Sequence, residues 1–415
     1  MEFETGKETE NPNDVGVTFK YISAYFSGNH RKDSSKEGKR YSSNNLRYKK
    51  DPNGPLNAFK TVTILGASGA MATEIIKRML TERPLGLFEK IQLFGRPKES
   101  FQGKEKNFYH AFIEKLRDGM AGILPIVDFI DSYDAVDGEL LIMCVGKTIS
   151  KEKGMLFDRS ILKHENRSIF ENCARSIYEN SFKSPDLVIV VSNPNELCTS
   201  IFSRYFKRVV AIGPVMDSLR LQREIREELN VPVEISIDAL VGGVHELTGM
   251  VPYKSMLRID GRRPNTQLLH RIFNSTIEAF DIRNVYEKAF EMVQNGDEGV
   301  FDFINTHSIL TRMAVKPLIE YYCGGKADFP MGIAVINTIK ALQDASRTLM
   351  TLTKRTLIKG ADVCIGIPLF VSTNGLEEIE LCSVKNFQED QDDEQLTKSA
   401  DALRQQYGIL PLKKQ

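Results

Sequence analysis

From residue 61 onward, short apolar runs alternate with longer segments in which apolar residues recur every three or four positions. The runs lack polar alternation, which is typical of parallel strands covered by helices on both faces. We expect such strands at 61–65, 91–94, 140–145 and 187–191, with a weaker one at 209–212. The helical periodicity predicts helices over Met71–Leu80, Ser160–Tyr178 and Asp217 to about Leu229. This alternation predicts an α/β fold with a Rossmann-type, doubly wound parallel sheet.

The second half of the chain changes character. Helical patterns mix there with short strands, including an apparent hairpin of 363–371 with 378–382, and a closing helix is expected at 393–406. At 415 residues the chain exceeds one comfortable core. We therefore expect a dinucleotide-binding domain over 59–215 and an α+β substrate-binding and catalytic domain over 216–415.

Residues 1–58 are rich in Ser, Asn and Lys, and a basic cluster lies between Arg31 and Lys50. Their hydrophobicity is too low for an independent core, so we predict a disordered basic arm. Either the arm is a solvated tail or it touches an anionic partner. The first residues carry several carboxylates and no apolar core segment, unlike a secretory signal or a transit peptide, so a cytoplasmic location is expected.

The overall charge is balanced, with 55 basic and 55 acidic side chains. No global field therefore favours nucleic acid or an anionic membrane, and neither is an expected partner. The longest apolar stretches have the length of strands and fall far short of the roughly 20 residues of a membrane span. The six cysteines are scattered without a CxxC pair, which indicates free thiols in a reducing compartment and no metal centre.

The first expected strand runs into the sequence Gly66-x-x-Gly69-x-x-Ala72. Glycine at 66 permits a sharp turn, Gly69 lets the backbone approach a pyrophosphate, and a small residue at 72 lets the helix pack closely on the strand. The position between a buried strand and a helix predicts a dinucleotide site. The residues expected to contact the cofactor here are Gly66, Ala67, Ser68, Gly69, Ala70 and Met71.

Three segments in the middle of the chain could build one hydride-transfer site: Val191-Ser192-Asn193-Pro194, Asp217-Ser218-Leu219-Arg220 and Val241-Gly242-Gly243-Val244-His245. The imidazole of His245 can act as a general base. Asp217 can orient it and raise its pKa toward the working pH, and Arg220 can hold a substrate carboxylate through two bonds. The set predicts oxidation of a hydroxy acid.

Together with the glycine loop, these segments resemble the lactate/malate dehydrogenase family, in particular its malate branch, over roughly Lys60 to Leu410. The resemblance implies reversible hydride transfer between NAD(P) and a 2-hydroxy acid, with malate and oxaloacetate as the expected pair. It implies that Asn193 bonds the reacting oxygen and the nicotinamide ribose region, and that Val191 lies against the cofactor. It also implies a homodimer.

The end of the second strand bears on the choice of cofactor. NAD-preferring members of the family carry an acid there for the ribose hydroxyls, whereas this chain has Gly95 followed by Arg96. No carboxylate repels a 2′-phosphate, and a guanidinium can hold one. We therefore expect NADP, with NAD as the alternative if Arg96 stacks on adenine or faces solvent.

The segment Val145–Arg159 corresponds to the mobile active-site loop of the family, with insertions. Its two arginine positions align best with Lys151 and Arg159. Arg159 would then polarise the carbonyl, and Lys151 would face the second carboxylate of a dicarboxylic acid. Lys147 and Lys153 are competing candidates, and all three lysines could be solvated. A residue within 330–334 is expected to pack over the substrate.

One other interpretation remains, and two more fit the sequence poorly. A catalytically impaired relative could bind cofactor as a regulatory or scaffold protein. The NAD-dependent glycosidases that share this fold need a metal-binding Cys/His pair, and no cysteine stands beside His245. Tyr322 and Lys326 have the YxxxK spacing of short-chain dehydrogenases, but they come far too late in the chain and enclose two glycines.

Overall fold

The computed structural model describes residues 47–82, 89–95, 104–120, 125–147, 159–273, 279–325, 327–384 and 391–407. Most of the expected basic arm, Arg96 and the loop residues 148–158, with Lys151 among them, lie outside these ranges. Arg159 is described as the first residue of a helix, without its side chain.

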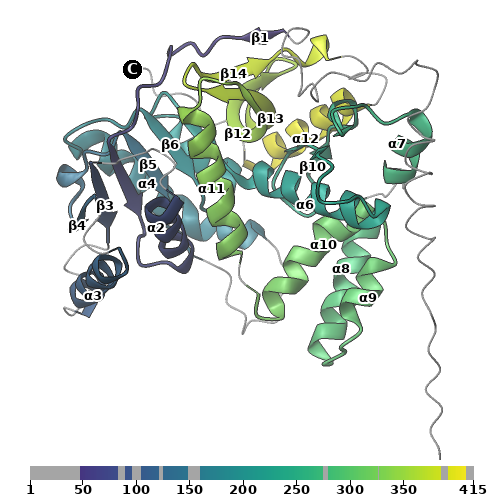
Figure 1. Cartoon of the computed structure of the whole chain (residues 1–415), viewed down its shortest axis with the longest axis horizontal. Coiled ribbons are helices and arrows are strands. Elements are labelled where there is room, and N and C mark those ends of the chain that lie inside the picture. Colours follow the sequence, from purple (N-terminus) through teal and green to yellow (C-terminus); the bar gives the residue numbers. More distant parts are fainter. Residues whose placement is uncertain are drawn as a thin grey trace, which may run out of the picture.

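Six parallel strands form one part of the main sheet (Figure 1). Their spatial order is β4-β3-β2-β5-β6-β7, the strand order of a doubly wound dinucleotide-binding sheet. The strands are β2 (Thr61–Leu65), β3 (Lys90–Phe94), β4 (Ile126–Ile130), β5 (Leu140–Met143), β6 (Leu187–Val190) and β7 (Val209–Ala211). The expected α/β fold class is confirmed.

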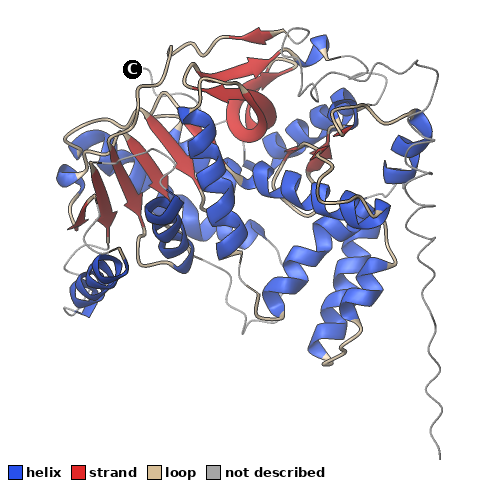
Figure 2. Cartoon of the chain, viewed as in Figure 1, coloured by secondary structure: helices blue, strands red, loops and turns tan. Residues whose placement is uncertain are grey.

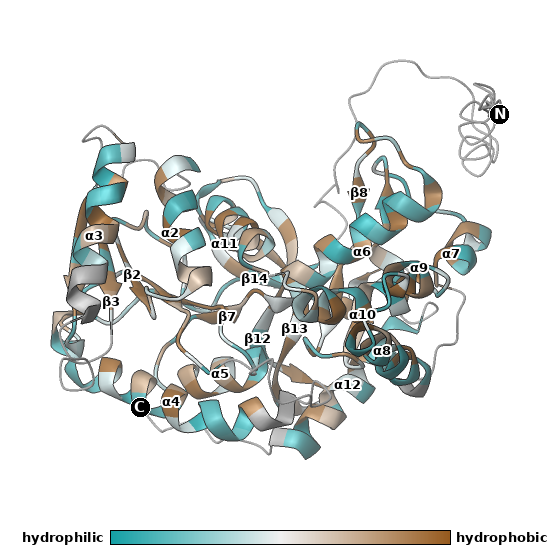
Figure 3. Cartoon of the chain, turned by 90° about the horizontal axis from the view of Figure 1, so that it is seen from below, coloured by the Kyte–Doolittle hydropathy of each residue, from teal (hydrophilic) through white to brown (hydrophobic). Residues whose placement is uncertain are grey.

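Helices cover both faces of this sheet, as Figure 3 shows. Neighbouring residues of one strand point to opposite faces. Ile64 therefore joins the core under α2 (Ala70–Glu82) and α11 (Asp328–Gln343), whereas Leu65 joins the core under α4 (Arg159–Asn180) and α5 (Asn195–Phe202). Burial on both faces explains why the strands read as unbroken apolar runs. The helix α3 (Lys104–Gly119) follows β3.

An antiparallel unit extends the sheet beyond β7. The strand β12 (Thr348–Ile358) pairs with β7 at Thr353 and Ala211, and β13 (Ala361–Ser372), β14 (Gly375–Ile379) and β1 (Tyr48–Lys49) follow. The β13–β14 hairpin was expected from the sequence, although β14 begins and ends three residues earlier than the predicted 378–382. The strands β12 and β4 were not expected. Both missed strands carry polar side chains among the apolar ones, so their pattern does not stand out from that of loops.

The remaining elements form the helical part of the chain (Figure 2). The helix α6 (Gly213–Leu229) begins four residues earlier than expected, because Pro214 is tolerated in a first turn. The others are β8 (Ile237–Asp238), β9 (Val241–Gly243), β10 (Met250–Pro252), β11 (Arg258–Ile259), α7 (Thr266–Phe273), α8 (Ala279–Gln294), α9 (Val300–Asn305), α10 (Ile309–Tyr322) and α12 (Asp392–Tyr407), with 3₁₀ turns at Tyr133–Ala135, Lys254–Met256 and Leu381–Ser383. Across the described ranges, no helix is both long and apolar enough to cross a bilayer.

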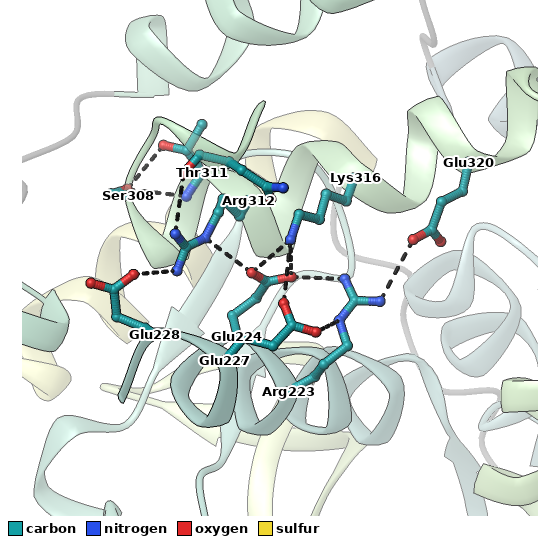
Figure 4. Close-up of polar contacts among 10 residues, drawn as sticks. Arg223, Glu224, Glu227, Glu228, Ser308, Thr311, Arg312, Lys316 and Glu320 are labelled. Carbon is teal, nitrogen blue, oxygen red and sulfur yellow. Dashed lines mark hydrogen bonds and ion pairs between the residues drawn. The ribbon is translucent and has the colours of Figure 1, made fainter. Parts of the chain in front are cut away.

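A buried ion network joins α6 to α10 (Figure 4). Glu224 on α6 is fully buried, and both of its carboxylate oxygens lie 2.9 Å from Nζ of Lys316 on α10. The guanidinium of Arg312 approaches the same carboxylate at 3.0 Å, and that of Arg223 at 2.7 Å. Because a buried charge is costly without partners, this network holds α6 in one position against α10. The same helix carries Asp217 and Arg220.

Candidate active site

The structure brings together side chains from the three segments singled out in the sequence. His245 follows β9, while Asp217 and Arg220 lie on α6, directly after β7. Nδ1 of His245 is 2.6 Å from Oδ2 of Asp217, and Nη1 of Arg220 donates to Oδ1 of the same carboxylate at 3.0 Å. The carboxylate of Asp217 thus contacts both the imidazole and the guanidinium.

Burial makes the contact between Asp217 and His245 strong. The two residues are 1% and 5% exposed. An ionised Asp217 accepts a hydrogen bond from Nδ1–H, which fixes the tautomer and leaves Nε2 as the nitrogen that can take a proton from a substrate. The low local dielectric strengthens this bond. The pair can therefore perform general acid–base chemistry.

The side chain of Arg220 remains 21% exposed while it contacts Asp217. A guanidinium offers five donors, so a bond to Asp217 is compatible with a second anion at the same side chain. The i,i+3 spacing of Asp217 and Arg220 predicts that they share one helix face, and the structure adds the direct bond between them.

Two glycines bring the histidine segment against the sheet. A Cβ at Gly242 would lie 2.4 Å from the carbonyl oxygen of Gly366 on β13, and Gly243 has φ +75°. Both positions therefore require glycine. The result is that β9 pairs with β13 at Gly243 and Gly366, which places His245 directly after a fixed backbone contact.

Asn193 lies three residues after the end of β6, and two other asparagines bond it. Nδ2 of Asn166 on α4 donates to the carbonyl of Asn193 at 2.8 Å, and Nδ2 of Asn195 donates to Oδ1 of Asn193 at 2.6 Å. Asn166 also bonds both the N–H and the carbonyl of Lys147, at the root of the expected loop. Asn193 is thereby linked to the start of that loop.

Three residues that the sequence analysis missed contact this group. The backbone N–H of His245 donates to Oε1 of the buried Glu196 at 2.8 Å. The backbone N–H of Gly213 donates to Oδ1 of Asn195 at 3.0 Å. A Cβ at Gly213 would lie 2.6 Å from Cγ of His245, so the start of α6 packs on the imidazole ring. The position of Asn195 and Glu196 just after Asn193-Pro194 was the only hint in the sequence.

The glycine loop forms a tight turn between β2 and α2. Gly66 has φ +75°, and a Cβ there would lie 3.1 Å from the backbone of Cys144. The N–H of Gly69 donates to the carbonyl of Gly66, which closes the turn into α2. Ser68, Gly69 and Ala70 are exposed at the start of this helix, where the dipole favours an anion.

The other residues of the expected cofactor site lie deeper. Ala67 is buried and Met71 is half-buried against the core. Val191 is buried, and its N–H donates to the carbonyl of Met143. Together with the glycine loop, these residues fit a dinucleotide laid across the ends of β2, β5 and β6.

Gly95 lies under a pair of stacked aromatic rings. The rings of Tyr109 and Phe129 are 4.3 Å apart, and a Cβ at Gly95 would lie 2.5 Å from Cε2 of Phe129. No side chain fits at this position without moving Phe129. The acidic side chain that binds ribose hydroxyls is therefore excluded here by packing as well as by sequence.

The segment 330–334 forms the first turns of α11. Met331 is buried, and a Cβ at Gly332 would lie 2.9 Å from Cδ of Arg78 on α2. These contacts show close packing between α11 and the helix that follows the glycine loop. The expected contact of this segment with the substrate stays a prediction.

In sequence, this chain is similar to lactate and malate dehydrogenases. Residues 60–209 match the family model described as lactate/malate dehydrogenase, NAD binding domain. A malate dehydrogenase of Chlorobium chlorochromatii is 22% identical over 326 residues, which cover 77% of this chain and 89% of that protein. A malate dehydrogenase of Methanothermobacter thermautotrophicus is 26% identical over 48% of this chain and 55% of its own length.

Solved structures show the same fold. A lactate dehydrogenase from a deep-sea metagenome library of the Medee basin superposes with a TM-score of 0.60 at 16% identity, covering 84% of this chain and 98% of its own. Malate dehydrogenase of Cryptosporidium parvum superposes with a TM-score of 0.57 at 18% identity, covering 84% and 97%. Both architectures therefore span the nucleotide-binding and the helical parts of this chain.

Proposed function

Because this chain belongs to the lactate/malate dehydrogenase family, we propose that it catalyses reversible hydride transfer between NAD(P) and a 2-hydroxy acid, with malate and oxaloacetate as the substrate pair. The observation that carries the proposal is the buried contact of His245 with Asp217, on the helix that also bears Arg220. These side chains combine a proton acceptor with a carboxylate-binding group.

His245 moves the proton in this proposal. Nε2 accepts the hydroxyl proton during oxidation, and the imidazolium that forms is stabilised by Asp217 at 2.6 Å. In the reductive direction the same nitrogen returns the proton to the new alkoxide. The hydrogen bond from the backbone N–H of His245 to Glu196 holds the backbone of His245 in place during both steps.

The substrate is held by its charge and by its reacting oxygen. Arg220 binds the carboxylate next to the hydroxyl carbon, and Nδ2 of Asn193 donates to the reacting oxygen. We assign polarisation of the carbonyl to Arg159 at the start of α4. We assign Lys151 to a second carboxylate of the substrate. A cation at this position favours a dicarboxylic acid over a monocarboxylic one.

A nicotinamide cofactor, when bound, supplies the carbon that accepts or donates the hydride. The glycine loop and the start of α2 hold its pyrophosphate. Because Gly95 carries no carboxylate and is covered by Phe129, nothing at this position repels a 2′-phosphate. We assign Arg96 to that phosphate and propose NADP as the preferred cofactor, with NAD as the alternative.

A panel of 2-oxo acids tests the proposal. Turnover of oxaloacetate, pyruvate and longer acids is measured with NADPH and with NADH, and binding of each cofactor is measured separately. We expect the highest kcat/KM for oxaloacetate with NADPH. A clear preference for NADH would remove the NADP assignment. Cofactor binding without turnover of any acid would instead favour a regulatory or scaffold protein.

A substitution of Lys151 tests its assignment to the second carboxylate of the substrate. Lys151→Gln removes the charge assigned to it, so kcat/KM should fall far more for oxaloacetate than for pyruvate. Lys147→Gln and Lys153→Gln test the two competing lysines of the same loop, and neither should discriminate between the two acids if Lys151 has this role. Equal losses on the two acids would reject the role of Lys151.

The proposed assembly is a homodimer, which sedimentation of the purified protein tests directly. A monomer that retains full activity would show that the site is complete in one chain.

A further inference from the structure

The first residue of α5 carries a buried amide in contact with the catalytic segments. Asn195 is only 1% exposed, so its amide group requires partners inside the protein. The bonds described for it go to Ser192 and Asn193, just after β6, and to Gly213, the first residue of α6. It therefore ties together two of the segments that build the site.

The direction of these bonds is fixed by chemistry. The backbone N–H of Gly213 can only donate, and it lies 3.0 Å from Oδ1 of Asn195. The amide of Asn195 must therefore turn its oxygen toward α6 and its nitrogen toward Asn193. Nδ2 of Asn195 then donates to Oδ1 of Asn193 at 2.6 Å, and also to the carbonyl of Ser192 at 3.3 Å.

These two bonds, from Gly213 to Asn195 and from Asn195 to Asn193, determine which way the amide of Asn193 is turned. Because Oδ1 of Asn193 accepts from Asn195, its Nδ2 is the end turned away from that bond. A carbonyl or alkoxide oxygen of a substrate needs a donor, and the opposite orientation of Asn193 would place an oxygen lone pair against it. The polarity of a residue that binds substrate is thus set by a neighbour that does not.

We propose that Asn195 is a positioning residue that orients the amide of Asn193 so that its NH₂ group faces the reacting oxygen of the substrate. The inference rests on the proposed function, because it uses the proposed role of Asn193. Asn195 itself touches neither the substrate nor the cofactor in this proposal.

The variant Asn195→Asp tests whether Asn195 sets the orientation of the Asn193 amide. The carboxylate keeps an acceptor for the N–H of Gly213 and nearly the same volume, but it can no longer donate to Asn193. The amide of Asn193 then turns its NH₂ toward position 195 and its oxygen toward the substrate. We expect kcat/KM to fall at least about tenfold, because this is the loss expected when a hydrogen bond to an oxygen that gains negative charge is removed.

A double-mutant cycle separates this role from a structural one or from the added charge. If Asn195 acts through Asn193, then Asn195→Asp costs almost nothing further in an Asn193→Ala background. A purely structural or electrostatic effect would persist in that background at its full size, and this result would overturn the proposal.

Thr199→Val is the matched control on the same buried face of α5. The hydroxyl of Thr199 is fully buried and has no hydrogen-bond partner among the described residues, so its loss should leave kcat/KM within twofold of the wild type.

The side-chain amide resonances of Asn193 report the same orientation without turnover. In protein labelled with ¹⁵N-asparagine, the NH₂ signals of Asn193, assigned by their loss in Asn193→Ala, should shift strongly in Asn195→Asp and not in Thr199→Val. Unchanged signals would overturn the inference. A wild-type protein without turnover on any acid would overturn the proposed function alone, and the amide signals would still decide the orientation of Asn193.

Discussion

Replacing Gly213 by alanine should damage catalysis while leaving the fold almost intact. Gly213 is the first residue of α6, and its added Cβ would lie 2.6 Å from Cγ of His245. Ordinary contact begins at 3.4 Å, so the ring or the helix must give way by 3.4 minus 2.6, which is 0.8 Å. The same Cβ would lie 2.8 Å from Oδ1 of Asn195. Both neighbours belong to the candidate site.

The expected magnitudes follow from this overlap. Overpacking costs about 1–3 kcal/mol. Because Gly213 is the first residue of α6 and not in its interior, the higher helix propensity of alanine offsets little of this cost, and the net loss in the free energy of unfolding should be about 1–3 kcal/mol. A misplacement of about 1 Å of a catalytic group costs on the order of a hundredfold in rate. We therefore expect kcat to fall by one to two orders of magnitude.

The assay compares kcat with oxaloacetate, cofactor affinity and thermal unfolding for Gly213→Ala and for Gly119→Ala. Gly119 ends α3, and a Cβ there meets nothing within 4 Å, so this control should retain full activity. A folded Gly213→Ala protein with wild-type kcat would refute the reasoning, because His245 would then tolerate a displacement of its ring.

Other predictions concern the base, the thiols and the buried ions. His245→Asn should lower kcat at least about a hundredfold while cofactor affinity, measured by titration, stays nearly unchanged. Desolvation raises the pKa of the half-buried Cys144 thiol to about 12, so at pH 8 only about one thiol in ten thousand is ionised, and iodoacetamide should label the exposed Cys323 before Cys144 in a mass-spectrometric time course. Raising the pH should speed labelling of Cys144, and equal rates for the two thiols at pH 8 would contradict the raised pKa of Cys144. Glu224→Leu removes the buried carboxylate that Lys316 and Arg312 share and leaves them only the more exposed Glu227 and Glu228, so it should cost about 3–5 kcal/mol in denaturant unfolding. Glu227→Gln, at a largely exposed carboxylate 3.7 Å from the same lysine, should cost less than about 1 kcal/mol, and similar costs would argue against the network.

The parallel half of the fold was predictable because its signals are local. Each of its buried strands is an unbroken apolar run, and the glycine loop marks the first turn between a strand and a helix. The antiparallel unit was harder to predict. The strand β12 mixes Thr, Lys and Arg with leucines, and its pairing with β7 involves Thr353 and Ala211, which are far apart in the chain. Nothing in the local pattern of β12 indicates this partner.

The candidate site divides in the same way. The residue types and order of Asn193, Asp217, Arg220 and His245 predicted an acid–base and carboxylate-binding site, and the structure places the last three in contact. The predicted roles of Arg96, Lys151 and Arg159 remain predictions, because those side chains lie outside the described part of the structure.

By itself the sequence determined the doubly wound sheet, the position of the glycine loop and the chemical groups available for catalysis, because periodicity and motif spacing encode these features locally. Only the tertiary structure decided how those groups are held. The bonds from Gly213 to Asn195 and from His245 to Glu196 join residues 18 and 49 positions apart. The order of the strands sets such distances, and the direction of each bond depends on which donor the fold places opposite each acceptor.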